Sequence, residues 1–119
     1  MYKITRVEVH VFGFDVPNRS LGPQKTAGVG NGIYEKGSKL RFNRYAVVIE
    51  AEDGARGEYV THWGGTSAAL AQTLMLAPRL IGCDSEARED IFSDCKRELR
   101  AYDRMGYGPL DIALWDLAG

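Results

Sequence analysis

The feature that most constrains this fold is the C-terminal segment Gly108-Pro-Leu-Asp-Ile-Ala-Leu-Trp-Asp-Leu-Ala-Gly119. Its apolar residues recur at helical spacing and form one stripe: Leu110, Ala113, Leu114 and Leu117. Pro109 suits the first helical position, where its missing N–H would be unpaired anyway. Asp111 in the first turn complements the helix dipole. No polar tail follows the stripe, so we expect a strongly apolar helix that joins a larger body.

Three segments in the first half of the chain have the period-two pattern of half-buried strands. In residues 3–14, valines alternate with polar residues at positions 7, 9 and 11. In residues 42–52, one face carries Tyr45, Val47, Ile49 and Ala51. Asp53-Gly54 is a hairpin signal, and Gly57–His62 returns as a third strand. The pattern predicts a three-stranded antiparallel β-meander.

Helices are expected in the second half of the chain. Thr66 or Ser67 can cap a helix that runs to about Ala77, where Pro78 interrupts it. Another helix starts at Asp84 or Ser85, with acidic residues first and basic residues last, as the helix dipole favours. Its expected buried stripe is Ala87, Ile91, Cys95, Leu99 and Tyr102. Strands followed by about three helices predict an α+β fold, with the helices on one face of the sheet.

Size and composition limit the classes of function. At 119 residues the chain is one domain, large enough to bury roughly two thirds of its unfolded surface. A formal net charge of −1 argues against nucleic acid or an anionic membrane as partner. No apolar run approaches the ~20 residues that span a bilayer, and residues 1–6 lack the apolar core of a signal peptide. Cys83 and Cys95 have no metal-type spacing, so we expect free thiols and a cytoplasmic location.

Two polar patterns have simple structural interpretations. Glu50 and Glu52 share a strand face, and paired carboxylates can hold a cation or divide acid and base roles. We favour the simpler interpretation, a solvated face beside the hairpin. The glycine-rich Gly28–Gly32 lacks the Gly-x-Gly-x-x-Gly spacing and does not predict nucleotide binding.

Two loops carry the candidate binding residues. The glycine-rich segment from Val16 to Leu40 contains Asn18, Arg19 and Lys25, whose cationic members could meet a substrate carboxylate or remain solvated. His62 and Trp63 end the third strand before two glycines. An imidazole beside an amphipathic ring suits a ligand-facing rim. The alternative is that Trp63 packs on the helices and His62 only lies nearby.

The segment Ile112–Gly119 resembles a junction in enolase-superfamily enzymes of the mandelate racemase and muconate-lactonizing type. There it joins an N-terminal α+β capping domain to a catalytic barrel. Three other stretches resemble the family in the same order: Tyr2–Val9, Val47–Glu58 and Leu76–Gly82. The resemblance implies that residues 1–119 are a capping and substrate-specificity domain of the enolase N-terminal type, ending where the barrel would begin. Trp115 and Asp116 would then seat this cap against the barrel.

The resemblance also implies a chemistry. Enzymes of this type remove a proton alpha to a carboxylate, Mg²⁺ stabilises the enediolate, and bases on the barrel move the proton. The outcome is racemisation, cycloisomerisation or dehydration, often of an acid sugar. No catalytic or metal-binding residue is carried over, because the matching positions would lie beyond Gly119. Mg²⁺ is implied only for the full-length enzyme, and the chain alone is not expected to be catalytic.

The partners implied are the protein's own C-terminal barrel domain, a small carboxylate or acid-sugar substrate, and further copies in a homo-oligomer. In the resembled family, the loops after the first and third strands reach over the barrel mouth. The residues expected to touch substrate are therefore Asn18, Arg19, Lys25, His62 and Trp63. The alternative function is a stand-alone α+β binding or oligomerisation module. In either case the apolar terminal helix predicts that the chain alone associates.

Overall fold

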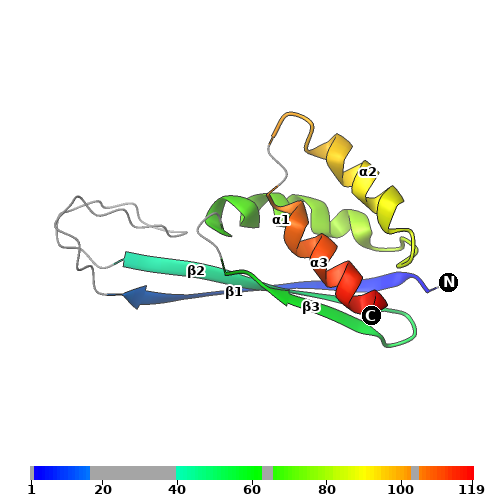
Figure 1. Cartoon of the computed structure of the whole chain (residues 1–119), viewed down its shortest axis with the longest axis horizontal. Helices are drawn as coiled ribbons and strands as arrows, with labels where there is room; N and C mark the ends of the chain where they lie inside the picture. Colours follow the sequence, from blue (N-terminus) through cyan, green and yellow to red (C-terminus); the bar gives the residue numbers. More distant parts are fainter. Residues whose placement is uncertain (1, 17–39, 63–65, 103–104) are drawn as a thin grey trace.

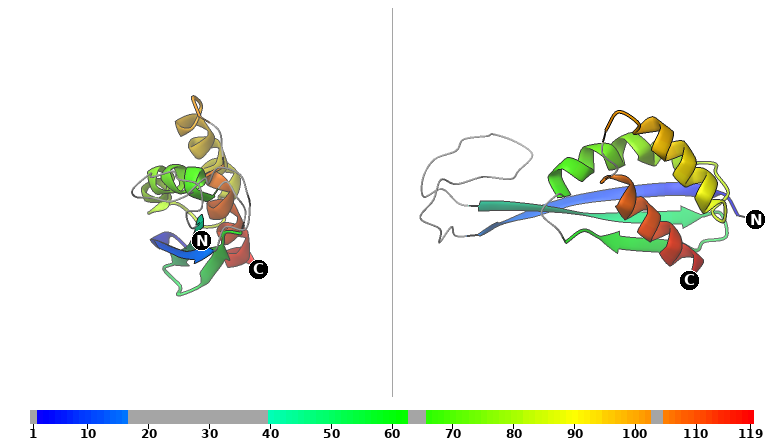
Figure 2. Two further views of the ribbon diagram at one scale, coloured as in Figure 1. Left: turned by 90° about the vertical axis from the view of Figure 1, so that its left-hand side faces the viewer. Right: turned by 45° about the horizontal axis from the view of Figure 1, so that its top comes forward.

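In the computed structural model, the described residues are 2–16, 40–62, 66–102 and 105–119. Three antiparallel strands, β1 (Ile4–Val16), β2 (Leu40–Ala51) and β3 (Arg56–Val60), form a sheet in the order β1-β2-β3. Three helices follow: α1 (Thr66–Leu80), α2 (Arg88–Glu98) and α3 (Tyr107–Ala118). The helices lie on one side of the sheet (Figures 1 and 2). The expected α+β fold, a meander followed by three helices, is confirmed.

The core forms between the inner face of the sheet and the helices. Tyr45, Val47 and Ile49 of β2 are fully buried, as their alternation predicts. Val7 and Val9 of β1 pack against this core at its margin. Val11 does not, because β1 is an edge strand whose end extends beyond the helices (Figure 1), and Val11 is 52% exposed.

The β2–β3 hairpin has the turn that Asp53-Gly54 predicts. Gly54 has a φ of 87°, which favours glycine. Its N–H donates to the carbonyl oxygen of Ala51, and Asp53 Oδ1 accepts from the N–H of Ala55 at 3.1 Å. Because β2 ends at Ala51, Glu52 does not share a strand face with Glu50. Instead, Glu52 Oε1 accepts from the backbone nitrogen of Lys3 at 2.9 Å.

The expected helix starts and ends need correction. α1 runs through Pro78 to Leu80, because Leu80 is fully buried and one lost hydrogen bond in the last turn is tolerated. α2 begins at Arg88 instead of Asp84 or Ser85. Those two residues bind the start of the chain: Asp84 bridges to Lys3, and the N–H of Ser85 donates to the carbonyl oxygen of Tyr2.

α3 also begins earlier than Pro109, at Tyr107. Gly106, the residue before it, is fixed by the side chain of Gln72, whose Oε1 accepts from the N–H of Gly106 at 2.8 Å. Pro109 is therefore the third helical residue. This position costs no intrahelical bond, because the first N–H groups of any helix have no helical acceptor.

The apolar stripe of α3 is covered by the chain itself. Leu110, Ala113 and Leu114 are fully buried, and Leu117 packs against the core. Trp115 is not covered in the same way, so the chain does not bury every large apolar residue of this helix. The large apolar residues of α3 that remain exposed are Ile112 and Trp115, at 44% and 56%.

The predicted buried stripe of α2 is confirmed for Ile91, Cys95 and Leu99. Ala87 precedes the helix and is only half-buried, and Tyr102 is 61% exposed because α2 ends at Glu98. Both cysteines are free thiols. Within the described residues, no helix is long and apolar enough to cross a bilayer.

Candidate functional site

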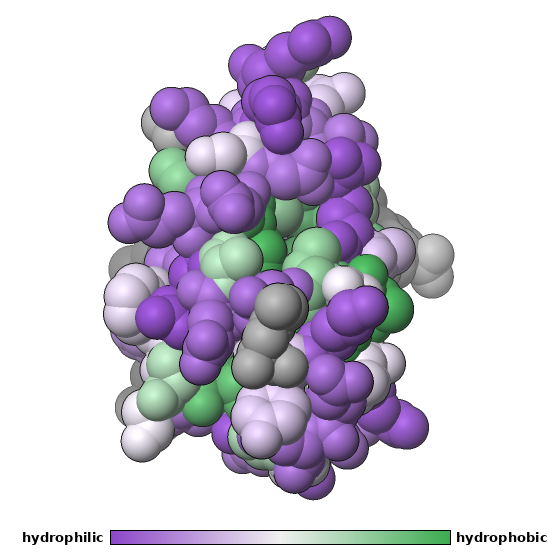
Figure 3. Space-filling view, turned by 90° about the vertical axis from the view of Figure 1, so that its right-hand side faces the viewer, coloured by the Kyte–Doolittle hydropathy of each residue, from purple (hydrophilic) through white to green (hydrophobic). Residues whose placement is uncertain are grey.

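The ends of the three strands define one end of the molecule as the candidate site. β1 ends and β2 begins at this end, and β3 points toward it (Figure 1). The β2–β3 turn and the N-terminus lie at the opposite end. Figure 3 views that opposite end, which is covered mainly by hydrophilic side chains with smaller hydrophobic areas between them.

His62 is the described member of the predicted binding residues, and it lies exposed just beyond β3. The hydroxyl of Tyr59 is 3.2 Å from His62 Nδ1, and the two rings meet edge to face with centroids 6.2 Å apart. Tyr59 packs against the core, so it fixes the imidazole on a rigid strand. Asn18, Arg19, Lys25 and Trp63 lie outside the described residues.

The segment that carries His62 is tied to β2 through Thr61. The N–H of Thr61 donates to the carbonyl oxygen of Tyr45, and Thr61 Oγ1 accepts from the N–H of Tyr45, both at 3.0 Å. Thr61 is buried. This reciprocal pair continues the β2–β3 pairing one residue beyond β3 and holds His62 next to the end of that strand.

A chain of buried hydroxyl groups joins β2 to α1 and to Gly106, the residue before α3. Thr73 Oγ1 of α1 donates to the carbonyl oxygen of Gly106 at 2.6 Å. The hydroxyl of Tyr45 therefore donates to Thr73 Oγ1, at 2.7 Å. Burial raises the pKa of Tyr45, so the phenol remains a proton donor. We did not predict this network, although a tyrosine at a core position signals that its hydroxyl needs a partner.

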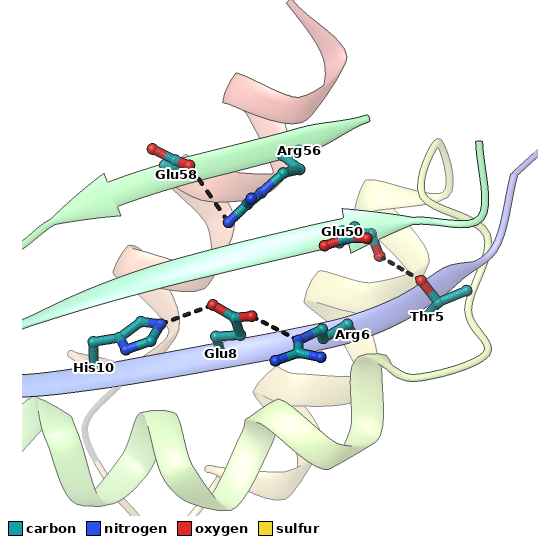
Figure 4. Close-up of polar contacts among 7 residues, drawn as sticks. All are labelled: Thr5, Arg6, Glu8, His10, Glu50, Arg56 and Glu58. Carbon is teal, nitrogen blue, oxygen red and sulfur yellow. Dashed lines mark hydrogen bonds and ion pairs between the residues drawn. The ribbon is translucent and has the colours of Figure 1, made fainter. Parts of the chain in front are cut away.

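The outer face of the sheet carries the polar residues drawn in Figure 4. On β1, Glu8 accepts from Arg6 Nε at 2.6 Å and contacts His10 Nε2 at 2.7 Å. The bond to His10 and then that to Arg6 lower the pKa of Glu8. Across the sheet, Arg56 and Glu58 form a looser pair at 3.8 Å. His10 is exposed, as predicted, and these contacts resemble a solvated surface network.

The described residues do not fit a magnesium site. Among residues 2–16, 40–62, 66–102 and 105–119, no three His, Cys, Asp or Glu side chains lie close enough to hold a metal ion. β2 ends at Ala51, between Glu50 and Glu52, so these two carboxylates do not share a strand face. We therefore assign no metal ligand to these residues.

The sequence is 34% identical over 91 residues to a 3,6-anhydro-alpha-L-galactonate cycloisomerase of Streptomyces coelicolor, covering 70% of this chain and 25% of that protein. A structure from Roseovarius nubinhibens ISM, assigned to the mandelate racemase/muconate lactonizing type, is 28% identical. It has a TM-score of 0.64 and matches 98% of this chain and 30% of its own. The chain belongs to the enolase superfamily. No protein-family model matches it.

A second solved structure shares the fold. It is the dipeptide epimerase of Enterococcus faecalis V583 complexed with Mg and the dipeptide L-Leu-L-Tyr. At 20% identity it has a TM-score of 0.65, and the match covers 98% of this chain and 31% of the epimerase. This chain thus spans about a quarter to a third of the length of these relatives.

Proposed function

We propose that this chain is the N-terminal capping and substrate-specificity domain of a Mg²⁺-dependent enolase-superfamily enzyme. The observation that carries the proposal is the asymmetric match: 97–100% of this chain corresponds to only 28–31% of the longer superfamily chains. The reaction would start with removal of a proton alpha to a carboxylate. Racemase, cycloisomerase and acid-sugar dehydratase outcomes all fit this class.

The proposed partner domain is a (β/α) barrel, and we propose that it docks beside Trp115. Arg88 of α2 places its guanidinium 4.2 Å from the centroid of the Trp115 ring. Arg88 Nε is buried without a hydrogen-bond partner in the described part of the chain. A hollow of about 440 Å³ lies here, lined by Arg88, Glu89, Phe92, Ser93, Asp111 and Trp115. An exposed aromatic beside an orphaned donor suits an interface that supplies apolar contact and one acceptor.

Under this proposal, the predicted binding residues, which we call the rim residues, would contact substrate. His62 lies just beyond the end of β3, whereas the remaining candidates, Asn18, Arg19, Lys25 and Trp63, lie outside the described residues. We propose that these residues select a small carboxylate or acid-sugar substrate. Such groups bind the substrate without taking part in proton transfer.

A hybrid enzyme tests this proposal. Residues 1–119 would replace the corresponding part of the Streptomyces coelicolor cycloisomerase, and alpha-proton exchange in deuterated water with Mg²⁺ would be measured on a panel of acid sugars. We expect exchange with a substrate ranking different from that of the parent. A folded hybrid that keeps the parent's ranking would contradict the specificity role. A Trp115→Ala hybrid should lose thermal stability, while the same change in the 119-residue chain should cost little.

The alternative is a stand-alone binding or oligomerisation module. One observation favours it: α3 completes a core within this chain, with Leu110 and Leu114 fully buried. A module of this kind would fold and function without a barrel. The hybrid distinguishes the two functions, because a module gives no reason for the chain to change the specificity of a superfamily barrel.

A further inference from the structure

The hydrogen bond between Tyr59 and His62 leaves one imidazole nitrogen available to a ligand. The hydroxyl of Tyr59 lies 3.2 Å from His62 Nδ1. Within the described part of the chain, His62 Nε2 has no partner, and the imidazole is exposed just beyond β3. The two nitrogens of an imidazole are distinct, because a hydrogen bond at one of them decides where the ring proton lies. Tyr59 can therefore determine which group His62 presents to a ligand.

Tyr59 is held more firmly than the histidine that it contacts. It is half-buried on the inner face of β3, lies opposite the fully buried Val47 of β2, and packs against the core. The planes of the Tyr59 and His62 rings meet at 76°, edge to face. The tyrosine is therefore the support, and the exposed imidazole is the group that it orients.

The chemistry of the two groups favours the tyrosine as the donor. The oxygen lone pairs of a phenol are partly delocalised into the ring, so a phenol donates a hydrogen bond more readily than it accepts one. A neutral imidazole accepts through its unprotonated nitrogen. With the proton on Nδ1, His62 would have to donate to the weak phenol acceptor, and Nε2 would present only a lone pair. The contact therefore favours the tautomer with the proton on Nε2.

We propose that Tyr59 is a positioning residue that keeps the proton of neutral His62 on Nε2, and that this Nε2–H donates to an oxygen of the substrate. The inference rests on the proposed function, which supplies a small acid or acid sugar as the ligand. Such molecules carry carboxylate and hydroxyl oxygens, which accept hydrogen bonds. A ring that is oriented in advance also lowers the entropy cost of ordering it when substrate binds.

Nitrogen-15 NMR of the labelled 119-residue chain tests the tautomer. The chain has two histidines, His10 and His62, and a His10→Ala variant assigns their signals. At about pH 8, where an ordinary imidazole is neutral, we expect the proton of His62 on Nε2. Tyr59→Phe keeps the ring but removes the hydroxyl, so the second tautomer of His62 should appear while the His10 signals stay unchanged. A proton on Nδ1 in the parent, or a tautomer ratio unchanged by Tyr59→Phe, would overturn the proposal.

A double-variant cycle in the hybrid enzyme tests the contact with substrate. His62→Ala should raise KM about tenfold and Tyr59→Phe about fivefold, with kcat unchanged in both. If Tyr59 acts through His62, Tyr59→Phe should have no further effect once residue 62 is alanine. His62→Gln retains a side-chain N–H and should restore most of the lost affinity. Additive effects in the cycle would show that Tyr59 does not act through His62.

Further measurements separate this inference from a loss of folding and from failure of the proposed function. Tyr2→Phe removes the hydroxyl of a half-exposed tyrosine beside the N-terminus, which lies at the opposite end of the molecule (Figure 1), and should leave KM unchanged. Circular dichroism establishes that each variant folds. A folded hybrid without alpha-proton exchange would contradict the proposed function and with it the substrate contact, whereas NMR of the chain alone decides whether Tyr59 sets the tautomer.

Discussion

The carboxylate of Asp116 in α3 accepts a hydrogen bond from the backbone nitrogen of Glu58 in β3, at 2.8 Å. A negative charge in the last turn of a helix opposes the helix dipole, so α3 gains nothing from Asp116 within the helix. The hydrogen bond instead stabilises the sheet: β3 is an edge strand, α3 packs against it, and Asp116 gives the backbone N–H of Glu58 an acceptor. Asp116 thus ties α3 to the edge strand β3.

Replacing Asp116 with alanine should lower the free energy of unfolding by about 1 kcal/mol, since one backbone donor loses its partner at an exposed site. Asp116→Asn keeps an acceptor oxygen and removes the unfavourable charge, so it should cost less. Urea denaturation followed by circular dichroism measures both. Equal stability of the alanine variant and the parent would show that water replaces the carboxylate without loss.

Gly57 allows β3 and α3 to approach closely. A Cβ at this position would overlap the carbonyl oxygen of Ala113 and the backbone nitrogen of Leu117. Gly57→Ala should therefore destabilise the chain by about 3 kcal/mol, because backbone on both sides must move. Gly108→Ala is the matched control: no atom lies within 4 Å of the added carbon, and the helix should gain up to about 1 kcal/mol. Thermal melts that rank these variants in the opposite order would contradict the packing.

The hydroxyl chain of Tyr45 and Thr73 should show energetic coupling. Thr73→Val leaves the Tyr45 hydroxyl without its acceptor in the core and removes one of the hydrogen bonds to the Gly106 carbonyl, so it should cost about 2 kcal/mol. Tyr45→Phe should cost about 1 kcal/mol. The double variant should cost less than the sum, because the unpaired phenol is no longer present. Additive losses in urea denaturation would mean that the two hydroxyls act independently.

Local patterns predicted the fold well because they report on backbone periodicity. The buried face of β2, the Asp53-Gly54 turn and the buried row Ile91, Cys95 and Leu99 follow directly from spacing. The errors arose where tertiary contacts override local signals. Leu80 extends α1 past Pro78, and the contacts of Asp84 with the chain start prevent an earlier start of α2.

The candidate site was less predictable for the same reason. His62 could be placed at a strand end from the sequence, but its partner Tyr59 and the support from Thr61 depend on pairing between strands. The apolar spacing of α3 alone does not reveal which of its large residues the sheet covers: Leu110 and Leu114 are buried, whereas Trp115 is exposed. Asn18, Arg19, Lys25 and Trp63 stay predictions.

Alkaline pH should weaken the fold through Cys95. Burial raises the pKa of this thiol to about 11, from an ordinary value of 9.0. The raised value means that the folded state holds its proton longer than the unfolded state. The stabilising contribution is complete below pH 9 and is lost as pH rises from 9 to 11. Urea denaturation at pH 8, 9 and 10 should show this decline. The Cys95→Ala variant should decline less steeply, and an identical slope would exclude the thiol as its cause.

In the hybrid enzyme, the rim residues should alter specificity and leave the chemical step intact. Groups that bind ground and transition states alike change KM, whereas groups that act only in the transition state change kcat. His62→Ala removes an exposed imidazole held by Tyr59; together with Trp63→Ala and Arg19→Ala it should change the ranking of acid-sugar substrates through KM. His10→Ala is the matched control, because His10 is an exposed histidine on the outer face of the sheet. Alpha-proton exchange should remain detectable with at least one substrate in each variant. If all three rim variants keep the hybrid's ranking, as His10→Ala should, these residues do not determine specificity.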